Sequence, residues 1–595
     1  MVINMFRFIR PLLVMLAAGS LSAQQADLSL GSTSLLGAAS GDNLGADGAV
    51  AVGDFNGDGA VDLAIASPGA DAPGGTRPDA GSVAIVFGGA AFPAVTDLAG
   101  TFGAVADVLI YGAGAFDRLG SDGGLLFADL NGDGRDELVI TASEADGPGN
   151  GRPGCGEVYI IAGQVAPPVT IDLAVDPQVT TVYGAEPDDR IGIHGALAAG
   201  DWNDQGPVDL AIGAYLADGP GNSRNAAGEV YILFGRVAFD WPATLDLATQ
   251  ASMRIAGHRA GDSLSRDGAL VSGDLNHDGV ADLVVGAEHA DGPDERRQQA
   301  GHVYVLYGSA SWGGLYDLAA TPADVTIHGA NAGDNLSDGN AILVGDFDGD
   351  GVGPDSGHDL IIGASFSDGL WEGRSDSGAI FFLRGGSLAP VIDLDLNQAD
   401  VVIYGADAGD RLSGDGSMLL ADFDGDGILD LAMAAIFGDG PGEDRPEAGE
   451  AYVIRGGPGL PWLLDLAVGD ADSVVYGADA GDFVGRGNGI GAGDFNNDGF
   501  ADLILVGFGA DGPGELRDSA GEAYILRGNV LLPPARDLRR HEEDFIVYGA
   551  SAGDTLGIDG SVIAGDFNGD DFDDLLIGAP FADGPGGRSG SGQAG

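Results

Sequence analysis

The sequence predicts an all-β protein, most simply a β-propeller built from four-stranded blades. Three observations support this prediction. An acidic motif recurs eight times, at intervals of 72 to 76 residues. Each interval contains four short β-rich runs separated by Gly, Pro, Asp and Asn, and no stretch of helical periodicity is long enough to compete. Glycine is unusually common, with 106 of 595 residues, and its even dispersal is typical of many tight turns between short strands.

Within one repeat the four runs follow in a fixed order. The first run enters the acidic motif, and a second run, such as 575–579, leaves it. A polar loop of the type 510–514 precedes the third run, 522–526. After an Asp-Leu spacer such as 465–466, the fourth run ends in Tyr-Gly-Ala, as at 475–478. Radial packing buries both faces of each sheet and leaves only short edges, so we expect eight blades, with a seven-bladed ring as the alternative.

Residues 1–23 have the layout of a secretory signal peptide. Arg7 and Arg10 precede an apolar run, 12–18, and small residues lead to Ala23. The apolar run is much shorter than a bilayer span, which favours export over membrane anchoring. The expected mature chain, 24–595, is then a single propeller domain without a membrane span. Cys155 is the only cysteine, so an intramolecular disulfide is impossible and another form of stabilisation is needed.

The charge distribution excludes several function classes. The 91 acidic and 26 basic residues give a net charge of −65, which argues against nucleic acid or an anionic membrane as a partner. All basic residues are Arg, so Schiff-base and phosphate-loop lysines are excluded. We expect neither catalytic residues nor an organic cofactor, because no two-His metal motif or nucleophile elbow is present. A catalytic site should break the repeat, and the largest breaks are 294–297, 370–372 and 353–357.

The acidic motif has the spacing of a calcium loop. Oxygen side chains occupy positions 1, 3, 5 and 9, glycine permits a sharp bend at position 6, and the carbonyl of position 7 adds a ligand. Without a cation, several crowded carboxylates would repel one another or take up protons. A helix-loop-helix calcium hand needs Glu at position 12, where these repeats have an apolar residue inside a strand run.

Four of the loops are regular, and four depart from the pattern. The predicted ligands of the regular loops are Asp54, Asn56, Asp58, Ala60 and Asp62; Asp274, Asn276, Asp278, Val280 and Asp282; Asp422, Asp424, Asp426, Ile428 and Asp430; and Asp494, Asn496, Asp498, Phe500 and Asp502. Those of three less regular loops are Asp129, Asn131, Asp133, Arg135 and Glu137; Asp346, Asp348, Asp350 and, across an insertion, Asp359; and Asp566, Asn568, Asp570 and Asp574, with Asp571 in place of glycine. The eighth loop, with Asp201, Asn203, Gln205 and Asp209, loses a charge at position 5, so weak or no binding is expected there.

Three motifs together carry a resemblance to a known family. The Tyr-Gly-Ala-x-x-Gly-Asp-x-Leu stretch (404–412, 548–556), the acidic loop and the Gly-Ala-Pro exit at 578–580 resemble the FG-GAP repeats of integrin α-subunit propellers and their bacterial relatives. The Gly-Ala-Pro element changes to Gly-Ala-Tyr at 213–215 and to Gly-Phe-Gly at 507–509. The resemblance implies that partners bind on the face opposite the calcium loops.

That opposite face is expected to carry one Arg per blade. Antiparallel strands A to D place the A–B loops on one face and the B–C loops on the other. We expect the B–C arginines to pair with neighbouring Asp carboxylates rather than to contact a ligand. They are Arg77, Arg152, Arg224, Arg296, Arg374, Arg445, Arg517 and Arg588.

The two ends of the sequence are expected to share one blade. Residues 27–38 match the spacer and fourth run, whereas 593–595 reach only the start of a third run. We therefore expect that blade to lack its third strand and the chain to continue beyond Gly595.

The functional interpretation is an exported, calcium-binding adhesion or recognition scaffold, secreted or at the cell surface. Its partner would be an extracellular protein or carbohydrate. Two alternatives stay open: an enzyme acting on extracellular polysaccharide, and a calcium-stiffened surface structural protein.

Overall fold

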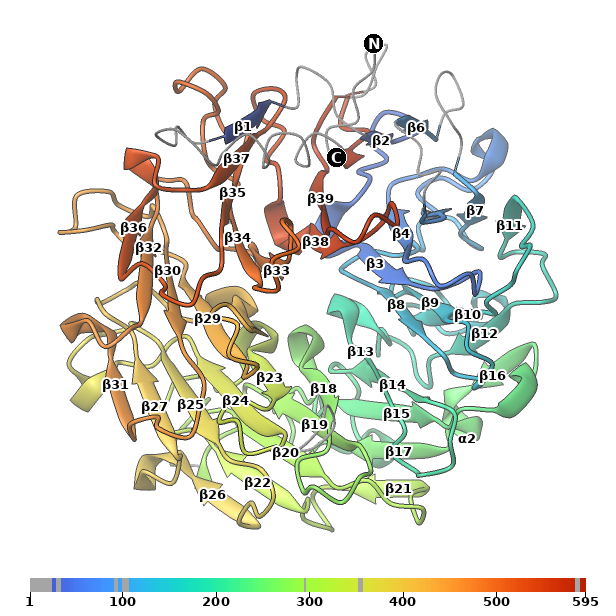
Figure 1. Cartoon of the computed structure of the whole chain (residues 1–595). Coiled ribbons are helices and arrows are strands. Elements are labelled where there is room, and N and C mark those ends of the chain that lie inside the picture. Colours follow the sequence, from blue (N-terminus) through green and yellow to red (C-terminus); the bar gives the residue numbers. More distant parts are fainter. Residues whose placement is uncertain are drawn as a thin grey trace.

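The computed structural model describes residues 24–27, 34–89, 95–98, 106–293, 296–351, 357–583 and 589–594. These residues form eight five-stranded sheets placed radially around one axis (Figure 1). The prediction of an eight-bladed β-propeller is confirmed, and the seven-bladed alternative is wrong. The proposed signal peptide, 1–23, lies outside the described residues. No helix of the described part of the chain is long and apolar enough to cross a membrane.

The strands occupy the same positions in each sheet, A innermost and then B, C and D. The A strands are β3 (Val50–Gly53), β8 (Leu125–Ala128), β13 (Leu197–Gly200), β18 (Leu270–Gly273), β23 (Ile342–Gly345), β28 (Met418–Ala421), β33 (Ile490–Gly493) and β38 (Val562–Gly565). The B strands are β4 (Asp62–Ser67), β9 (Glu137–Ala142), β14 (Asp209–Ala214), β19 (Asp282–Ala287), β24 (Asp359–Ala364), β29 (Asp430–Ala435), β34 (Asp502–Gly507) and β39 (Asp574–Ala579). The C strands are β5 (Ser82–Val86), β10 (Glu157–Ile161), β15 (Glu229–Leu233), β20 (His302–Leu306), β25 (Ala379–Leu383), β30 (Glu450–Ile454), β35 (Glu522–Leu526) and β40 (Gln593–Ala594). The D strands are β7 (Val108–Tyr111), β12 (Thr180–Tyr183), β17 (Met253–Ala256), β22 (Val325–His328), β27 (Val401–Tyr404), β32 (Ser473–Tyr476), β37 (Phe545–Tyr548) and β2 (Ser34–Leu36).

Each blade also has a fifth strand, which corrects the expectation of four. The Asp-Leu spacer is extended and pairs in parallel with strand D of the preceding repeat, as β36 does with β32. A three-residue run between two loops has too little pattern to be recognised as a strand in the sequence. Every repeat therefore donates an edge strand to the sheet of its predecessor. These strands are β11 (Thr170–Asp172), β16 (Thr244–Asp246), β21 (Gly314–Asp317), β26 (Val391–Asp393), β31 (Leu463–Asp465), β36 (Ala535–Asp537), β1 (Gln24–Asp27) and β6 (Val95–Asp97).

Short helical segments connect the strands. Those before strand A are η3 (Ala46–Gly48), η6 (Ile193–Gly195), η9 (Arg266–Gly268), η11 (Asp338–Asn340), η14 (Gly414–Gly416) and η17 (Ile558–Gly560). Those in B–C loops are η4 (Pro73–Gly75), η5 (Pro148–Asn150), η7 (Pro220–Asn222) and η12 (Leu370–Glu372). Those flanking the fifth strand are η8 (Val237–Phe239), α2 (Leu247–Gln250), η13 (Leu394–Leu396), η15 (Leu466–Val468) and η16 (Leu538–Arg540).

The hydrophobic core consists of separate clusters between neighbouring blades. All six residues of a B strand such as β29 are buried. Between the first and eighth blades, Leu63 and Ile65 pack in one cluster with Phe567 and Leu576. Each sheet thus buries both faces against its neighbours, which is how a long all-β chain without disulfides obtains a core.

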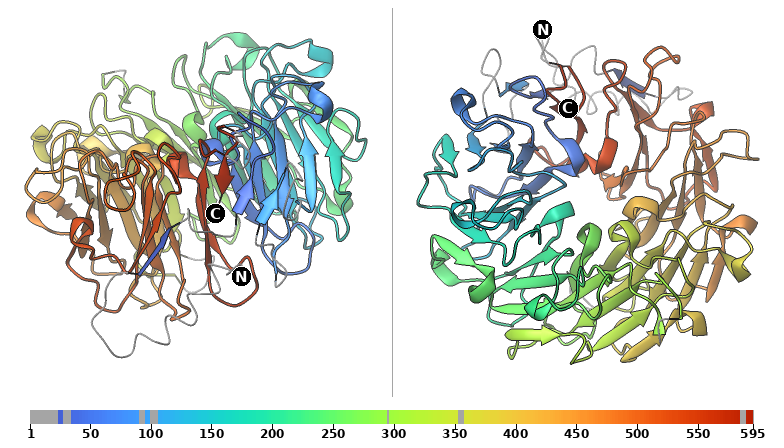
Figure 2. Two further views of the ribbon diagram at one scale, coloured as in Figure 1. Left: turned by 90° about the horizontal axis from the view of Figure 1, so that it is seen from above. Right: turned by 180° about the vertical axis from the view of Figure 1, so that it is seen from behind.

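Both ends of the chain complete one blade. The order is β38, β39, β40, β2 and β6, so C-terminal strands pair with N-terminal ones; blue and red segments meet there in Figure 2. The expected gap at the third strand is wrong, because β40 pairs with Ala579 of β39 on one side and with Leu36 of β2 on the other. Ser561 Oγ also donates a hydrogen bond to Gly45 O, at 2.7 Å, across the closure.

Candidate metal centres and the opposite face

The first Asp of each A–B loop shapes the loop through its own carboxylate. In the loop before β29, the backbone N–H groups of Gly425 and Gly427 donate to the two oxygens of Asp422, at 2.6 and 2.9 Å. Gly57 and Gly59 contact Asp54 in the same way, at 2.7 and 2.9 Å. The chain therefore curls around position 1, with the bend expected of the glycine at position 6.

The carboxylate at position 9 ties the loop to the end of strand C. Asp430 is 1 % exposed and accepts the N–H of Phe423 at 2.9 Å and of Gly456 at 3.0 Å. Asp359 accepts the N–H of Phe347 and Gly385 at 3.1 and 3.0 Å. Asp359 thus takes the same place across the insertion, as expected. Position 9 has a structural role that the ligand pattern alone did not indicate.

The Asn side chain at position 3 points its amide oxygen away from the carboxylate at position 9. The Asn203 Nδ2 group donates to both oxygens of Asp209, at 2.6 and 2.7 Å, and Asn568 contacts Asp574 similarly. This fixes the amide orientation, so Oδ1 is left for another partner. Asn131 Oδ1 and Asn203 Oδ1 are buried without a hydrogen-bond partner. A buried oxygen acceptor without a donor fits a cation ligand.

Two loops bring three carboxylates together. Oxygens of Asp422, Asp424 and Asp430 all lie within 4.8 Å of one another, and so do oxygens of Asp346, Asp348 and Asp350. Two oxygens bound to one Ca²⁺ at about 2.3–2.6 Å are separated by at most about 5 Å. These residues therefore fit a hard divalent cation. Each of the two loops also has a nearby Arg that would compete with a cation for one carboxylate: Arg384 contacts Asp348, and Arg455 Nε lies 3.4 Å from Asp424.

Burial dominates the electrostatics of the carboxylate at position 9. Burial, and then nearby carboxylates, raise the pKa of Asp430 to about 6 and of Asp359 to about 7. Burial raises the pKa of Glu137 to about 7 as well. A bound cation would favour the ionised carboxylates and reverse these shifts. In the loop of Glu137, Arg135 pairs with Asp133 and would compete with a cation there.

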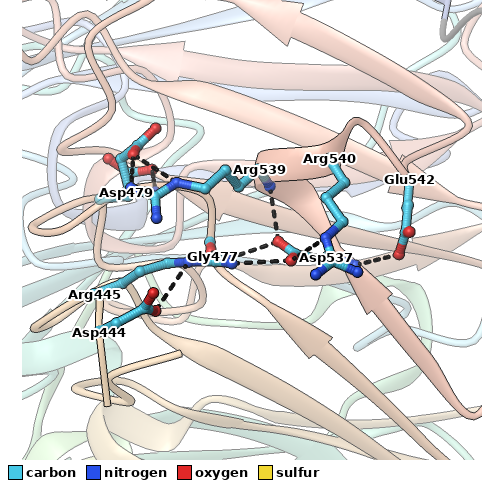
Figure 3. Close-up of polar contacts among 9 residues, drawn as sticks. Asp444, Arg445, Gly477, Asp479, Asp537, Arg539, Arg540 and Glu542 are labelled. Atoms are coloured by element: carbon cyan, nitrogen blue, oxygen red, sulfur yellow. Dashed lines mark hydrogen bonds and ion pairs between the residues drawn. The ribbon is translucent and has the colours of Figure 1, made fainter. Parts of the chain in front are cut away.

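On the opposite face, the B–C arginines hold the fifth strand in place. Arg445 Nη1 donates to Asp537 Oδ1 at 2.7 Å and to the Gly477 carbonyl at 2.6 Å (Figure 3). The two charged side chains are 5 % and 7 % exposed. Asp537 ends β36, so this pair links the B–C loop of one repeat to a strand of the next. The expectation of structural pairing is confirmed for Arg445.

The same link recurs around the ring. The pairs are Arg77–Asp172, Arg152–Asp246, Arg224–Asp317, Arg297–Asp393, Arg374–Asp465 and Arg445–Asp537. Arg517 donates to the Gly549 carbonyl at 2.7 Å. The choice of Arg296 is wrong: Arg296 is exposed, and its neighbour Arg297 makes the contact. Arg588 lies outside the described residues.

Buried carboxyl groups also line this face. Tyr524 Oη donates to Glu522 at 2.6 Å, and the Glu450–Tyr452 pair repeats this arrangement. Burial raises the pKa of Glu522 to about 7, and burial together with Glu450 raises that of Asp410 to about 8. A raised pKa in the folded state means that the protonated form stabilises the fold.

The raised pKa values of these buried carboxyl groups make the stability of the cation-free protein depend on pH. The stabilisation is fully present below the unfolded pKa near 4 and is lost as pH rises through 6 to 8. After removal of divalent cations, thermal unfolding should show a melting temperature higher at pH 5.5 than at pH 8, by about 5 °C or more. Asp410→Asn should reduce the difference. A melting temperature that rises from pH 5.5 to pH 8 would contradict the raised pKa values of these carboxyl groups.

A patch of Arg and Phe side chains on this face was not found from the sequence. One or two positions after strand B, and within the D–A loops, side chains differ from blade to blade. Arg486 lies over the rings of Phe437 and Phe483, both at 5.0 Å, and Arg411 lies over Phe366 at 4.3 Å. Phe483 stacks on Phe508 with centroids 5.6 Å apart. The change from Gly-Ala-Pro to Gly-Phe-Gly was the signal for this patch.

The structure thus defines an eight-bladed β-propeller whose A–B loops are rich in oxygen ligands. The family described as FG-GAP repeat matches residues 47–86, 123–161, 268–306 and 560–594, so the chain contains FG-GAP repeats in four places. Each matched segment covers strands A to C of one blade. The family resemblance seen in the motifs is therefore confirmed.

Curated relatives share part of the chain. Phosphatidylinositol-glycan-specific phospholipase D of Homo sapiens is 31% identical over 210 residues, which is 35% of this chain and 23% of the relative. Integrin alpha-PS2 of Drosophila melanogaster is 26% identical over 303 residues, 49% of this chain and 19% of the relative. The chain thus spans less than a quarter of the length of these relatives. Among solved structures, the exotype rhamnogalacturonan lyase YesX is 13% identical with a TM-score of 0.41, covering 93% of this chain and 72% of that one.

Proposed function

We propose that this protein is an exported, calcium-binding propeller that recognises an extracellular protein or carbohydrate. The observation that carries the calcium assignment is the loop 422–430, where three carboxylates converge around a tightly turned backbone. Oxygen-only ligands in a flexible loop suit Ca²⁺ better than Mg²⁺, which demands octahedral geometry and keeps several waters. Calcium supplies the stabilisation that disulfides provide in other exported proteins.

The calcium assignment is tested by counting bound ions. Asp422→Asn should remove one Ca²⁺ per chain in equilibrium dialysis, because position 1 loses its charge. Asp559→Asn is the control, since it also replaces one Asp by Asn but lies in η17, on the face opposite the A–B loops. Its ion count should equal that of the wild type. Equal counts for all three proteins would overturn the assignment.

The recognition role rests on the patch of Arg411, Arg486 and the four neighbouring Phe side chains. All six side chains are half-buried, and Arg and aromatic groups are over-represented where proteins bind partners. The side chains at these positions differ between blades, whereas the Arg–Asp links of the same face recur around the ring. The patch lies on the side that the FG-GAP resemblance associates with partners.

This role is tested by screening the calcium-loaded protein on immobilised extracellular glycans and matrix proteins. Arg486→Ala should weaken binding of any partner found by at least about tenfold. Leu531→Ala is the control, because Leu531 is 76 % exposed in the loop between β35 and β36, on the face opposite the patch. The proposal expects binding without turnover, so a reducing-sugar assay on bound polysaccharide should stay flat. Absence of binding would favour a surface structural protein.

A further inference from the structure

A polar cluster in one sector of the ring lies close to the axis, on the face opposite the A–B loops. Arg266 and Asp267 belong to η9, Glu288 directly follows β19, and Asp338 begins η11. Segment η9 packs against η6 and η11, and these short segments surround the axis in Figure 2. Glu288 breaks the repeat: the other seven blades have Pro68, Ser143, Tyr215, Ser365, Ile436, Phe508 and Pro580 at its position.

Three carboxylates from separate segments converge in this cluster. Oxygens of Asp267, Glu288 and Asp338 all lie within 4.8 Å of one another. Ser365 Oγ donates to Asp338 at 2.7 Å and orients it. His194 contacts Asp267 on its other side. The three carboxylates come from the fourth and fifth blades, so a group bound between them would join two sheets.

Glu288 supplies the observation that points to a ligand. Its side chain is 2 % exposed, and its Oε1 lies 3.0 Å from Arg266 Nη1 and 3.4 Å from His289 Nε2. The other oxygen, Oε2, is buried and has no hydrogen-bond partner. A buried carboxylate oxygen without a donor is costly, and more so beside two further carboxylates. Either a proton or a cation must satisfy it.

The charge balance favours a divalent cation. With all three carboxylates ionised, the state that a bound cation favours, Arg266 offsets one of them and leaves a charge of about −2 before His194 is counted. Oxygens within 4.8 Å of one another can share one Ca²⁺, since ligands at about 2.3–2.6 Å lie at most about 5 Å apart. Asp267 retains 25 % exposure, so one edge of the cluster is open to solvent.

We propose that Asp267, Glu288 and Asp338 bind one divalent cation that prefers oxygen ligands, with Ca²⁺ as the test ion. The cation joins the fourth and fifth blades near the axis. This site is independent of the A–B loops, because it lies on the other face and uses side chains from three separate segments. The axial site can therefore be wrong while the assignment of the A–B loops is correct. Equally, the loop assignment can be wrong while the axial site is correct.

Ion counting with Ca²⁺ tests the proposal. Glu288→Gln should lower the number of Ca²⁺ ions bound per chain by one in equilibrium dialysis. The double variant Glu288→Gln with Asp422→Asn should lower that number by two. Asp559→Asn is the matched control, because Asp559 occupies the position of Asp267 in the eighth repeat, where Pro580 replaces Glu288. This control should keep the wild-type count. An unchanged count for Glu288→Gln overturns the site.

Thermal unfolding with and without Ca²⁺ separates a cation site from a simple ion pair. If Glu288 is a ligand, Glu288→Gln makes the gain in melting temperature on adding Ca²⁺ smaller. If Glu288 serves only to pair with Arg266, the same change lowers the melting temperature without Ca²⁺ and leaves the gain intact, which overturns the proposal. Should Glu288→Gln fail to fold, Asp338→Asn provides the same two measurements without removing the partner of Arg266.

Discussion

Removing calcium is expected to lower the melting temperature of this protein by at least about 15 °C. Each cation that binds only the folded chain adds RT ln(1 + [L]/Kd), or about 2.7 kcal/mol when the ion is at a hundred times its Kd. Several loops contribute together, and the chain has only Cys155 and therefore no disulfide of its own to compensate. Thermal unfolding at pH 7, with Ca²⁺ and with excess chelator, measures the effect.

Two controls sharpen this experiment. Mg²⁺ added to the chelated protein should restore little of the loss, because a loop of several carboxylates and a carbonyl does not offer its octahedral geometry. Restoring free Ca²⁺ should recover the melting temperature in full. A melting temperature that does not respond to chelator would refute the calcium loops and leave them as acidic turns.

Breaking the buried pair Arg445–Asp537 should cost about 3–5 kcal/mol of unfolding free energy. Arg445→Ala leaves Asp537 as a buried carboxylate without its main partner, and it also removes the donor to the Gly477 carbonyl. Burial of both side chains, at 5 % and 7 % exposure, means that water replaces the lost contacts poorly. Denaturant unfolding in the presence of Ca²⁺ measures the change.

The neighbouring pair in Figure 3 provides a matched control. Arg539 contacts Asp479 at 2.6 Å, but the two side chains are 45 % and 38 % exposed. Arg539→Ala should therefore cost less than about 1 kcal/mol. The double variant Arg445→Ala with Asp537→Ala should recover part of the loss, since no unpaired charge stays buried. Equal costs for Arg445→Ala and Arg539→Ala would contradict the role of the buried link.

The features that the sequence determined are those encoded within one short segment. The turn at Gly427 and the oxygens of Asp422, Asp424 and Asp430 lie within nine residues, so their spacing alone specified a loop that can hold a cation. Repetition of that loop at 72 to 76 residues, with four β-rich runs between copies, specified the propeller.

Other features depended on contacts between distant segments. Asp537 meets Arg445 only because the spacer strand β36 joins the preceding blade, and the choice between Arg296 and Arg297 depended on where their loop places each side chain. Likewise, Asp267, Glu288 and Asp338 lie in three segments that radial packing brings to the axis. Local spacing determined the repeats and their loops, whereas the arrangement of whole blades decided the links between repeats and the axial cluster, because those contacts exist only once the ring has closed.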